Sequence, residues 1–560
     1  MENSATEWFS RRSTYTAWST ESAERVLLQS HSAPFSPQRI LQTLIVLQAF
    51  FGYIPPQAQE WLVRKTGTHI ADIRSLLSFY SFLVDTPPPA FHLRFANNII
   101  EQHAGLDELH ERVQAELCGT DCIIETTSCI GLSDHPLPVL VNGFPVTRLD
   151  MNNVHDFCNL IRSKTPLECW PESWFGINNV VRHSGPLTRY QYIPGLGIKN
   201  AQGLTREQII QQVGDAGLRG LGGAGFPTAF KWHWCEQQPE PIKYIVCNAD
   251  EGEPGTFKDR FYLTKQMDRV IEGMAIAARA VGARKGYIYL RGEYLYLYQA
   301  IQQELQHAKQ IGILNDLFEI ELHLGAGAYI CGEESALIES LQGKRGIPTS
   351  KPPYPGEKGL FGKPTVVNNV ETFASVTYIF QEGSSAFHSM GTEKSKGSRL
   401  HSVSGDCEQP GLYELPQGTP LSKLLSLCGA KATQCVQVGG PSGQLLFPDQ
   451  FDTTLDFEGP GHGGAIMIFD TSRSVMSITQ NFSNFFRHES CGFCTPCRAG
   501  TVALTHLLER YTKLPENRQQ TSKDLLELTE LMNKSSHCGL GKTAGQPVAS
   551  MLRWANDHDR

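Results

Sequence analysis

The chain has 560 residues, more than one hydrophobic core can serve, and this length predicts roughly three to five domains. Hydrophobic residues make up 40% of the chain and charged residues 19%, which is ordinary for a globular protein. The net charge is −8 and basic residues form no run, which argues against a nucleic-acid partner and against an anionic membrane surface.

The first part of the chain is predicted to be helical and then to change to a small α/β unit. Apolar residues recur at helical spacing within 1–90, and prolines interrupt them. Residues 91–160 place a helical stretch between strand-like segments, and 161–200 have no clear period, which indicates a linker packed on its neighbours. No apolar segment of a secretory signal begins the chain, and the apolar stretch 41–54 is too short to cross a membrane.

The remaining sequence divides into three further units. Residues 201–390 alternate strands with helices, which predicts helices covering a largely parallel sheet. Residues 395–472 contain short strands and turns, and 473–560 are helical. Fifteen cysteines are too few for a disulfide scaffold and fit a reducing cytoplasm. The isolated cysteines are expected to be small core side chains, namely Cys158, Cys169, Cys235, Cys247, Cys407, Cys428 and Cys435.

Four cysteines of the C-terminal helical unit form a metal-binding pattern. Cys491, Cys494 and Cys497 place three thiolates within seven residues, and Cys538 follows 41 residues after the third. Thiolates suit iron–sulfur clusters and zinc, and three clustered cysteines with one distant cysteine favour a [4Fe–4S] cluster. The alternatives are zinc, which more often takes paired C-x₂-C knuckles, and four unligated buried thiols.

A glycine-rich loop in residues 217–225 indicates a binding site for a phosphate or a flat ring system. Its glycines let backbone N–H groups approach a ligand closely, and a following helix adds the dipole of its first turn. An ordinary turn is the competing interpretation. The loop differs from the common dinucleotide fingerprint, because Phe226 and Pro227 follow it directly and no clear strand precedes it.

Polar and acidic residues recur where predicted strands of the 201–390 unit end. They are Asn248, Asp250, Glu251 and Glu253 after one strand, Glu333 and Glu334 after a second, and Lys351, Tyr354, Asn368 and Asn369 in a later loop. Acidic groups at a strand end contact ribityl or ribose hydroxyls or a metal, or else form a solvated turn. Several such loops on one sheet predict a ligand site at its edge.

These segments, in this order, closely resemble the flavin-binding, NADH-oxidising subunit of respiratory complex I and its relatives in NAD-linked hydrogenases and formate dehydrogenases. The resemblance covers residues 200–560 and includes ESCGFCTPCRAGT with the distant Cys538. It implies an α/β multidomain protein. The implied domains are a Rossmann-like FMN and NADH domain (201–390), a small ubiquitin-like β-grasp domain (395–472) and a helical bundle that binds the [4Fe–4S] cluster (473–560).

Residues 40–150 resemble the thioredoxin-like [2Fe–2S] subunit of complex I, through GYIPPQAQEWLVRKTG and LSFYSFLVDTPP in particular. The positions of its four cluster cysteines fall here on Ala96, Glu101, Cys129 and Ser133. The resemblance therefore implies that the thioredoxin-like module (91–160) has lost its cluster, since alanine cannot ligate iron. A cluster rescued by Cys118 and Cys122 together with Cys129 is the alternative.

A degenerate first module fused to a flavin subunit most resembles the diaphorase large subunit of cytoplasmic NAD-reducing [NiFe] hydrogenases. The resemblance implies hydride transfer between NAD(H) and FMN, single-electron transfer between FMN and the cluster, and coupling of NAD⁺ reduction to hydrogen oxidation. It also implies a hetero-oligomer with a small iron–sulfur diaphorase subunit and a [NiFe] hydrogenase dimer. The alternatives are the NADH-oxidising or NAD-reducing subunit of a formate dehydrogenase or of complex I, and a non-catalytic assembly subunit.

The resemblance also implies roles for individual residues. The phosphate loop of FMN is implied to consist of Gly220, Gly222 and Gly223, next to Gly225, with Lys231 as its cationic partner. Leu221 departs from the family, because it replaces a commonly basic residue. The ribityl chain and the ring edge are implied to contact Asn248, Asp250, Glu251, Tyr329, Asn368 and Asn369. NADH is implied to contact Phe226, Trp234, Glu253, Glu334, Lys351 and Tyr354, with Glu333 beside them.

The chemistry of such a protein belongs to its cofactors, so no side chain is expected to act as nucleophile or base. Glu334 has one physical consequence. A carboxylate near the ribose 2′-oxygen accepts hydrogen bonds from the diol but repels a 2′-phosphate, so the sequence predicts a preference for NAD over NADP.

Overall fold

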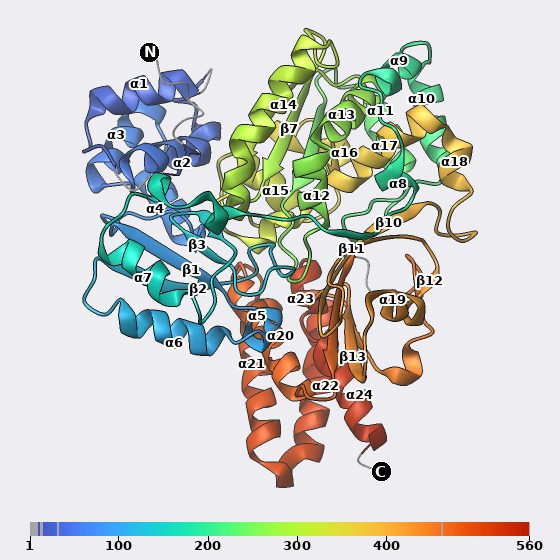
Figure 1. Cartoon of the computed structure of the whole chain (residues 1–560). Coiled ribbons are helices and arrows are strands. Elements are labelled where there is room, and N and C mark those ends of the chain that lie inside the picture. The colour runs from blue at the N-terminus through green and yellow to red at the C-terminus, as the bar shows by residue number, and fades with distance from the viewer. Residues whose placement is uncertain (1–8, 12–14, 31–32, 461–462, 559–560) are drawn as a thin grey trace.

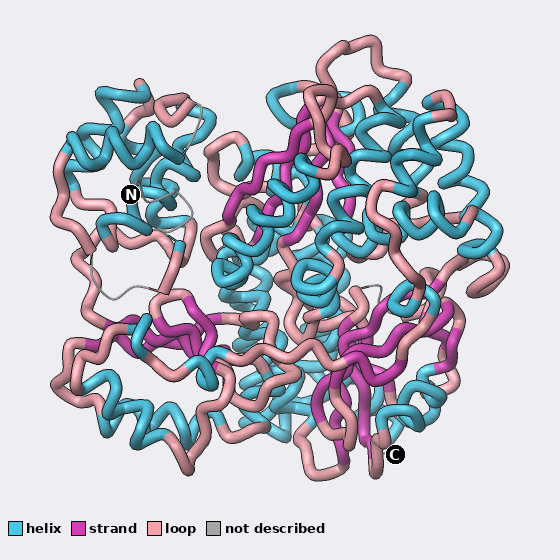
Figure 2. Tube along the Cα trace, turned by 45° about the horizontal axis from the view of Figure 1, so that its top comes forward, coloured by secondary structure: helices cyan, strands magenta, loops and turns pink. Residues whose placement is uncertain are grey.

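The computed structural model describes residues 9–11, 15–30, 33–460 and 463–558, and Figure 1 shows how their helices and strands are arranged. The expectation that no secretory signal begins the chain concerns residues that lie partly outside these ranges. The strands gather in separate sheets, with helices and loops between them (Figure 2). In the described part of the chain, no helix has both the length and the hydrophobicity needed to span a membrane.

The N-terminal helical region packs against one edge of the central sheet. It contains α1 (Thr20–Ser30), α2 (Ile40–Phe51), α3 (Pro56–Thr66) and α4 (Ile70–Phe79). Helix α2 is apolar on nearly every face and is largely buried. The side-chain amide of its Gln42 donates to the carbonyl of Leu324 at 2.8 Å and accepts from the N–H of Leu324 at 3.1 Å. This pair of hydrogen bonds fastens α2 to the end of the edge strand.

Residues 91–162, where a thioredoxin-like module was predicted for 91–160, form a four-stranded sheet with three helices. Its elements are β1 (Phe91–Ala96), α5 (Ile99–His103), α6 (Leu106–Glu116), β2 (Cys122–Thr127), β3 (Val139–Val141), β4 (Phe144–Val146) and α7 (Val154–Arg162). The sheet order is β2-β1-β3-β4, with β1 parallel to β2 and antiparallel to β3. Leu106, Leu109 and Val113 recur on one face of α6 and enter the core of this module.

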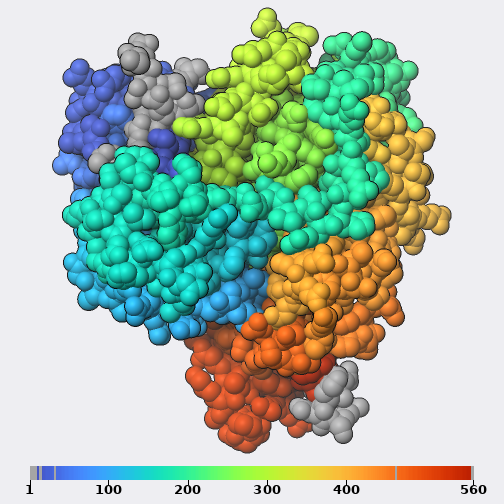
Figure 3. All heavy atoms as spheres, in the orientation of Figure 1, coloured from blue at the N-terminus to red at the C-terminus, as the bar shows by residue number. Residues whose placement is uncertain are grey.

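The segment after α7 contributes to a neighbouring domain instead of only linking two of them. It contains β5 (Val181–His183), α8 (Pro186–Arg189) and the start of α9 (Leu196–Gln202), and β5 pairs in parallel with β11 (Gly411–Pro416). In the space-filling view this segment, in blue-green, runs across the face of the molecule (Figure 3). The prediction was a linker packed on its neighbours, and it did not include β5, because a strand of three residues is too short to show an alternating pattern.

The central domain is built on four parallel strands in the order β8-β7-β6-β9. The strands are β6 (Tyr244–Ala249), β7 (Lys285–Leu290), β8 (Glu319–Leu324) and β9 (Thr365–Asn369). The helices are α10 (Arg206–Ala216), α11 (Thr228–Glu236), α12 (Lys258–Lys265), α13 (Met267–Val281), α14 (Tyr298–Gln310), α15 (Glu334–Leu341), α16 (Pro355–Lys358), α17 (Val370–Glu382) and α18 (Ser384–His388). Strand β6 is apolar along most of its length because helices cover both faces of such a sheet.

The β-rich domain is a mixed sheet crossed by one helix. Its elements are β10 (Ser398–Gly405), β11, β12 (Thr419–Pro420), α19 (Leu421–Cys428), β13 (Thr433–Val438), β14 (Gln444–Leu446), β15 (Thr454–Leu455) and β16 (Ala465–Asp470). The main sheet has the order β14-β13-β16-β10-β11-β5, with β10 parallel to β16. Leu421, Leu424 and Leu425 of α19 pack into the core beneath it.

The C-terminal helical domain contains α20 (Val475–Glu489), α21 (Thr495–Lys513), α22 (Arg518–Ser535), α23 (Gly539–Thr543) and α24 (Gln546–His558). One apolar core joins Phe482 of α20 to Phe469 of the β-rich domain and to Ile99 of the thioredoxin-like module. The isolated cysteines are mostly buried as expected, but Cys169 is exposed and Cys407 is partly exposed, so neither is a core residue.

Candidate functional site

A cavity of about 580 Å³ lies where the strands of the central sheet end, a volume within the roughly 300–1,000 Å³ typical of ligand pockets. Nine of the predicted cofactor residues line it, namely Gly222, Gly223, Asn248, Asp250, Glu251, Glu253, Tyr329, Glu333 and Asn369. Other parts of its wall come from Ser442 in the β-rich domain and Leu540 in the C-terminal helical domain. Three domains therefore enclose one pocket.

The glycine loop forms one wall of this pocket because side chains would not fit there. A Cβ at Gly222 would lie 2.7 Å from the Cβ of Asn369, and a Cβ at Gly225, whose φ is +62°, would lie 2.4 Å from the ring of Phe457. At Gly223 an added Cβ would meet nothing within 4 Å. The loop is thus held closely on one side and leaves open space on the other, where a phosphate can approach its backbone donors. Leu221 points inward and is buried.

The acidic residues after β6 are fixed by hydrogen bonds. Both oxygens of Glu251 accept bonds, from the N–H of Asp259 at 2.8 Å and from the Tyr294 hydroxyl at 2.9 Å. Glu253 accepts from the N–H of Ser442 at 2.7 Å and from the hydroxyl of Tyr329. Burial raises the pKa of Glu251 to about 7 and also raises the pKa of Glu253.

Asp250 differs from Glu251 and Glu253 because one of its carboxyl oxygens makes no hydrogen bond with the described residues. Its Oδ2 is buried and has no hydrogen-bond partner among the described residues. Burial raises the pKa of Asp250 well above its ordinary value. An unpaired buried carboxyl oxygen on the wall of a ligand-sized cavity fits a ligand that offers hydroxyl or N–H donors there. A flavin mononucleotide offers both, so the residues present fit this cofactor.

Lys258 is a cation at this pocket that the sequence interpretation did not include. Its ammonium group lies 2.6 Å from Asp259 and 2.9 Å from Glu371, and its side chain is 1% exposed. Burial alone would lower the pKa of Lys258, but the two carboxylates raise it above its ordinary value. Its place in the sequence, five residues after Glu253 of the acidic segment 250–253, is the signal that could have pointed to it.

Lys231, Glu334 and Lys351 form a second charged group outside the wall of the main cavity. Lys231 lies 3.1 Å from Glu334, and Lys351 lies 2.8 Å from both Glu333 and Glu334. Burial would raise the pKa of Glu334, but the two ammonium groups lower it to about 2. In this arrangement Lys231 pairs with a carboxylate and with the carbonyl of Val367.

Aromatic side chains form a row next to this charged group. Ring centroids are 5.7 Å apart for Phe226 and Phe230, 6.0 Å for Phe230 and Trp234, and 5.3 Å for Trp234 and Tyr354. Phe226, Phe230 and Tyr354 are all more than 40% exposed. Phe230 was not among the predicted residues, although positions 226, 230 and 234 follow helical spacing into α11. Exposed aromatic rings in a row suit a flat heterocycle.

Asn368, Gly220 and Asn369 make hydrogen bonds that support the wall of the pocket. Asn368 accepts a hydrogen bond of 2.9 Å from the indole of Trp232, and Gly220 donates its N–H to the carbonyl of Phe226 at 2.9 Å. Asn369 donates to Asp259 at 2.6 Å and caps α17 by accepting from the N–H of Glu371. Asn368 and Gly220 do not line the cavity.

The four cysteines of the C-terminal pattern line one small cavity. Cys491 follows α20, Cys494 and Cys497 begin α21, and Cys538 precedes α23. Burial raises the pKa of the Cys497 thiol to about 11, an effect to which the neighbouring thiols add. Four thiolates in one such space need a cationic centre between them, so the donor set fits an iron–sulfur cluster. Ile330 lines both this cavity and the main pocket.

No group of three or more His, Cys, Asp or Glu side chains within the described ranges is spaced to hold a metal ion directly. In the thioredoxin-like module, three of the four cluster-ligand positions, Glu101, Cys129 and Ser133, lie near one another. The Cys129 sulfur lies 3.6 Å from the Ser133 hydroxyl, and burial raises the pKa of Glu101 to about 8. Cys122 begins β2 and Thr127 ends it, which separates them by about 16 Å at ~3.3 Å per residue. The structure therefore does not bring Cys122 to Cys129.

Comparison with known proteins places each region. The family model described as the Nuo51 FMN-binding domain matches residues 213–378, the iron–sulfur binding region of NADH-ubiquinone oxidoreductase-F matches 477–558, and the thioredoxin-like [2Fe-2S] ferredoxin matches 27–161.

Relatives match over most of the chain. The alpha chain of the NAD-reducing hydrogenase HoxS of Cupriavidus necator is 38% identical, over 92% of this chain and 90% of that one. An NADH-quinone oxidoreductase chain of Aquifex aeolicus is 40% identical, over 63% of this chain and 86% of that one. A crystal structure of NAD+-reducing [NiFe]-hydrogenase in the air-oxidized state contains a chain with a TM-score of 0.86 and 37% identity, covering 93% of both chains. The chain therefore belongs to the family of flavin- and iron–sulfur-binding, NADH-oxidising subunits of NAD-reducing hydrogenases and of complex I.

Proposed function

We propose that this chain is the diaphorase subunit of an NAD-reducing hydrogenase. It transfers hydride between NAD(H) and FMN and single electrons between FMN and a [4Fe–4S] cluster. The observation that carries this choice is the extent of the match. The hydrogenase relative matches 92% of the chain, including the thioredoxin-like module, whereas the NADH-quinone oxidoreductase relative matches 63%.

FMN, when bound, supplies the hydride and single-electron chemistry. The chain's residues bind and orient the cofactor and the substrate. We propose that Gly220, Gly222, Gly223 and Gly225 present backbone donors to the phosphate, and that Lys258 or Lys231 supplies positive charge. Asn248, Asp250, Glu251, Tyr329, Asn368 and Asn369 would then contact or support the ribityl chain and the ring edge. We propose that these walls, contributed by three domains, shield the reacting face from bulk water.

NADH is proposed to bind along the aromatic row. Phe226, Phe230, Trp234 and Tyr354 would stack on or surround the adenine, and Glu253 would face the nicotinamide. Glu334, held between two lysines, is proposed to accept hydrogen bonds from the adenosine ribose and to favour NAD over NADP. Glu333 caps α15 through the N–H groups of Ser335 and Ala336 and holds Lys351, so its proposed role is support.

Cys491, Cys494, Cys497 and Cys538 are the proposed ligands of the [4Fe–4S] cluster. We further propose that the thioredoxin-like module binds no cluster, because its four ligand positions offer one thiol. The chain works in a hetero-oligomer with a hydrogenase. In finer detail, we propose a small iron–sulfur diaphorase subunit as the direct partner and a [NiFe] hydrogenase dimer beyond it, in the cytoplasm.

Anaerobic purification of the chain with its partners tests this function. We expect bound FMN, iron and sulfide, a flavin spectrum that NADH bleaches, and hydrogen-dependent reduction of NAD⁺. Formate-dependent reduction without a response to hydrogen would favour a role in a formate dehydrogenase. Colourless protein that lacks both FMN and iron would refute the proposal and favour an assembly role.

A further inference from the structure

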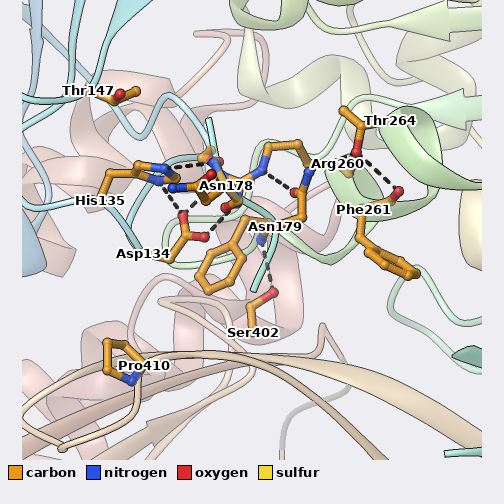
Figure 4. A network of polar contacts seen from close by, with 12 residues as sticks. Asp134, His135, Thr147, Asn178, Asn179, Arg260, Phe261, Thr264, Ser402 and Pro410 are labelled. Atoms are coloured by element: carbon orange, nitrogen blue, oxygen red, sulfur yellow. Dashed lines mark hydrogen bonds and ion pairs between the residues drawn. The ribbon is translucent and has the colours of Figure 1, made fainter. Parts of the chain in front are cut away.

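A loop of the thioredoxin-like module, residues 129–134, reaches into the central domain. There it meets Arg260, which is fully buried. The guanidinium of Arg260 donates to the carbonyl of Gly131 at 2.7 Å and forms an ion pair of 2.5 Å with Asp134. Asn179 accepts a further hydrogen bond of 2.9 Å from the same guanidinium, and Figure 4 shows this group between Asp134 and the segment around Asn178 and Asn179. A buried charge held this way fixes the loop firmly, because losing its partner is costly.

Two more residues of the central domain touch the same loop. The guanidinium of Arg291 donates to the carbonyl of Cys129 at 2.6 Å. Gly131, whose φ is +73°, packs so closely on Tyr294 that an added Cβ would lie 2.3 Å from the tyrosine hydroxyl. The loop therefore contacts three residues, and each contact leaves little room for movement.

The same three residues all hold Glu251. The backbone N–H of Arg260 donates to Oε2 of Glu251 at 3.2 Å, and the hydroxyl of Tyr294 donates to the same oxygen at 2.9 Å. Arg291 donates to the backbone carbonyl of Glu251. Glu251 is 6% exposed and lines the main pocket. These three contacts on Glu251 thus come from residues that the loop itself touches.

We infer that loop 129–134 positions Glu251 at the flavin pocket, with Asp134 and Gly131 as positioning residues. This inference rests on the proposed function, in which Glu251 lies at the flavin ring edge. It gives the thioredoxin-like module a role that does not need a cluster. Two of the four cluster-ligand positions, the retained Cys129 and the replaced Ser133, lie within this loop. The segment that corresponds to an iron-binding loop therefore supports a neighbouring cofactor site here.

The pKa of Glu251 depends on the groups around its carboxylate, so a change in its position can be measured as a change in this pKa. The charged and titratable groups that face it are Lys258, Asp259 and Arg260 of α12, and Arg291, Tyr294 and Tyr296 after β7. Burial raises the pKa of Glu251 to about 7, whereas the hydrogen bond from Tyr294 lowers it. Weakening the hydrogen bond from Tyr294 therefore raises the pKa of Glu251 further. The carboxylate beside the flavin ring then gains its negative charge at a higher pH.

The test uses the full chain with the variants Asp134→Asn, Gly131→Ala and Tyr294→Phe, and with Asp156→Asn, an exposed acid of the same module, as the control. One readout is FMN binding to the apoprotein, measured by fluorescence quenching. The other is the pH dependence of the flavin midpoint potential, measured by spectroelectrochemistry. We expect the FMN dissociation constant to rise about tenfold in Asp134→Asn and Gly131→Ala. We also expect the inflection of the potential near pH 7 to move upward by about half a pH unit in all three variants.

A double-mutant cycle separates positioning from general damage. Because Gly131→Ala acts through the hydroxyl of Tyr294, it should move the inflection little further in a Tyr294→Phe background. This cycle also carries the test if Asp134→Asn does not fold. A wild-type chain that binds no FMN overturns the proposed function and this inference with it. Wild-type binding of FMN, with all variants keeping its dissociation constant and inflection, overturns the inference alone.

Discussion

The ammonium group of Lys351 lies 2.8 Å from the carboxylate of Glu334, next to the exposed aromatic row. Lys231 approaches the same carboxylate from the other side at 3.1 Å. This arrangement keeps Glu334 ionised, since its pKa is lowered to about 2. A carboxylate that stays charged at any working pH can discriminate between a ribose diol and a 2′-phosphate.

Glu334→Gln should relax the preference for NAD over NADP. The amide is neutral and does not repel a phosphate, so the ratio of kcat/KM for the two coenzymes should fall about tenfold or more. Glu339→Gln, on the same helix, is the matched control. Equal discrimination by the wild type and Glu334→Gln would contradict this prediction.

Phe230→Ala should weaken NADH binding with little effect on turnover. Phe230 lies between Phe226 and Trp234 in the aromatic row, and its loss removes a stacking surface used before and during hydride transfer alike. We expect KM for NADH to rise by roughly tenfold while kcat changes little. Steady-state kinetics with ferricyanide measure both. Leu317→Ala, at an exposed apolar position, should behave as the wild type.

Cys538→Ala should remove the iron–sulfur cluster but leave the flavin. With one ligand replaced by a methyl group, iron content should fall from about four atoms per chain to below one. Iron analysis and electron paramagnetic resonance of the reduced protein measure the loss. Cys169→Ala, at an exposed position, is the control. Full iron content in Cys538→Ala would require another fourth ligand.

Lys258→Met should destabilise the central domain. The substitution leaves Asp259 and Glu371 buried without their cation, which costs on the order of 3–5 kcal/mol. A clear fall in the temperature of the first thermal transition should result, together with weaker FMN retention. Lys285→Met removes a cation from more exposed ion pairs with Glu319 and Glu321, and should shift the transition far less.

Glu101→Gln should stabilise the protein at high pH only. The carboxyl group has an ordinary pKa of 4.5 and a folded-state pKa of about 8, so between these values the folded chain holds a proton that the unfolded chain releases. Stability from this group is therefore present at low pH and is lost as pH rises toward 8. We expect equal thermal midpoints for variant and wild type at pH 5 and a higher midpoint for the variant at pH 8.5. The exposed substitution Glu108→Gln is the control, and a midpoint difference that does not depend on pH would contradict the assigned pKa.

Contiguous motifs were predictable from the sequence, and contributions from distant segments were not. The glycine loop and the cysteines 491–497 are readable because their chemistry is local. Ser442 donates a hydrogen bond to Glu253 from 189 positions away in the sequence. No rule of residue spacing could have predicted this contact. The fold class could be predicted because the helical and strand-like hydrophobic periods are clear in most units, and the structure confirms it.

Two misses have simple physical reasons. Strand β5 has three residues and gains its place from pairing with β11 rather than from an alternating pattern. The charge of Lys258 suggests an exposed position. In the structure Lys258 is buried, and its ion pairs with Asp259 and Glu371 compensate its charge. The position of β5 and the burial of Lys258 both depend on contacts with residues far away in the sequence, and a single sequence does not show such contacts.

The hydrogen bonds between Gln42 and Leu324 have a consequence for association. Strand β8 borders the central sheet, and its outer backbone groups would otherwise be available to a strand from another polypeptide. The side-chain amide of Gln42 takes the place of such a strand and bonds both the N–H and the carbonyl of Leu324. The N-terminal helices therefore block edge-to-edge strand pairing, and with it aggregation, at this point.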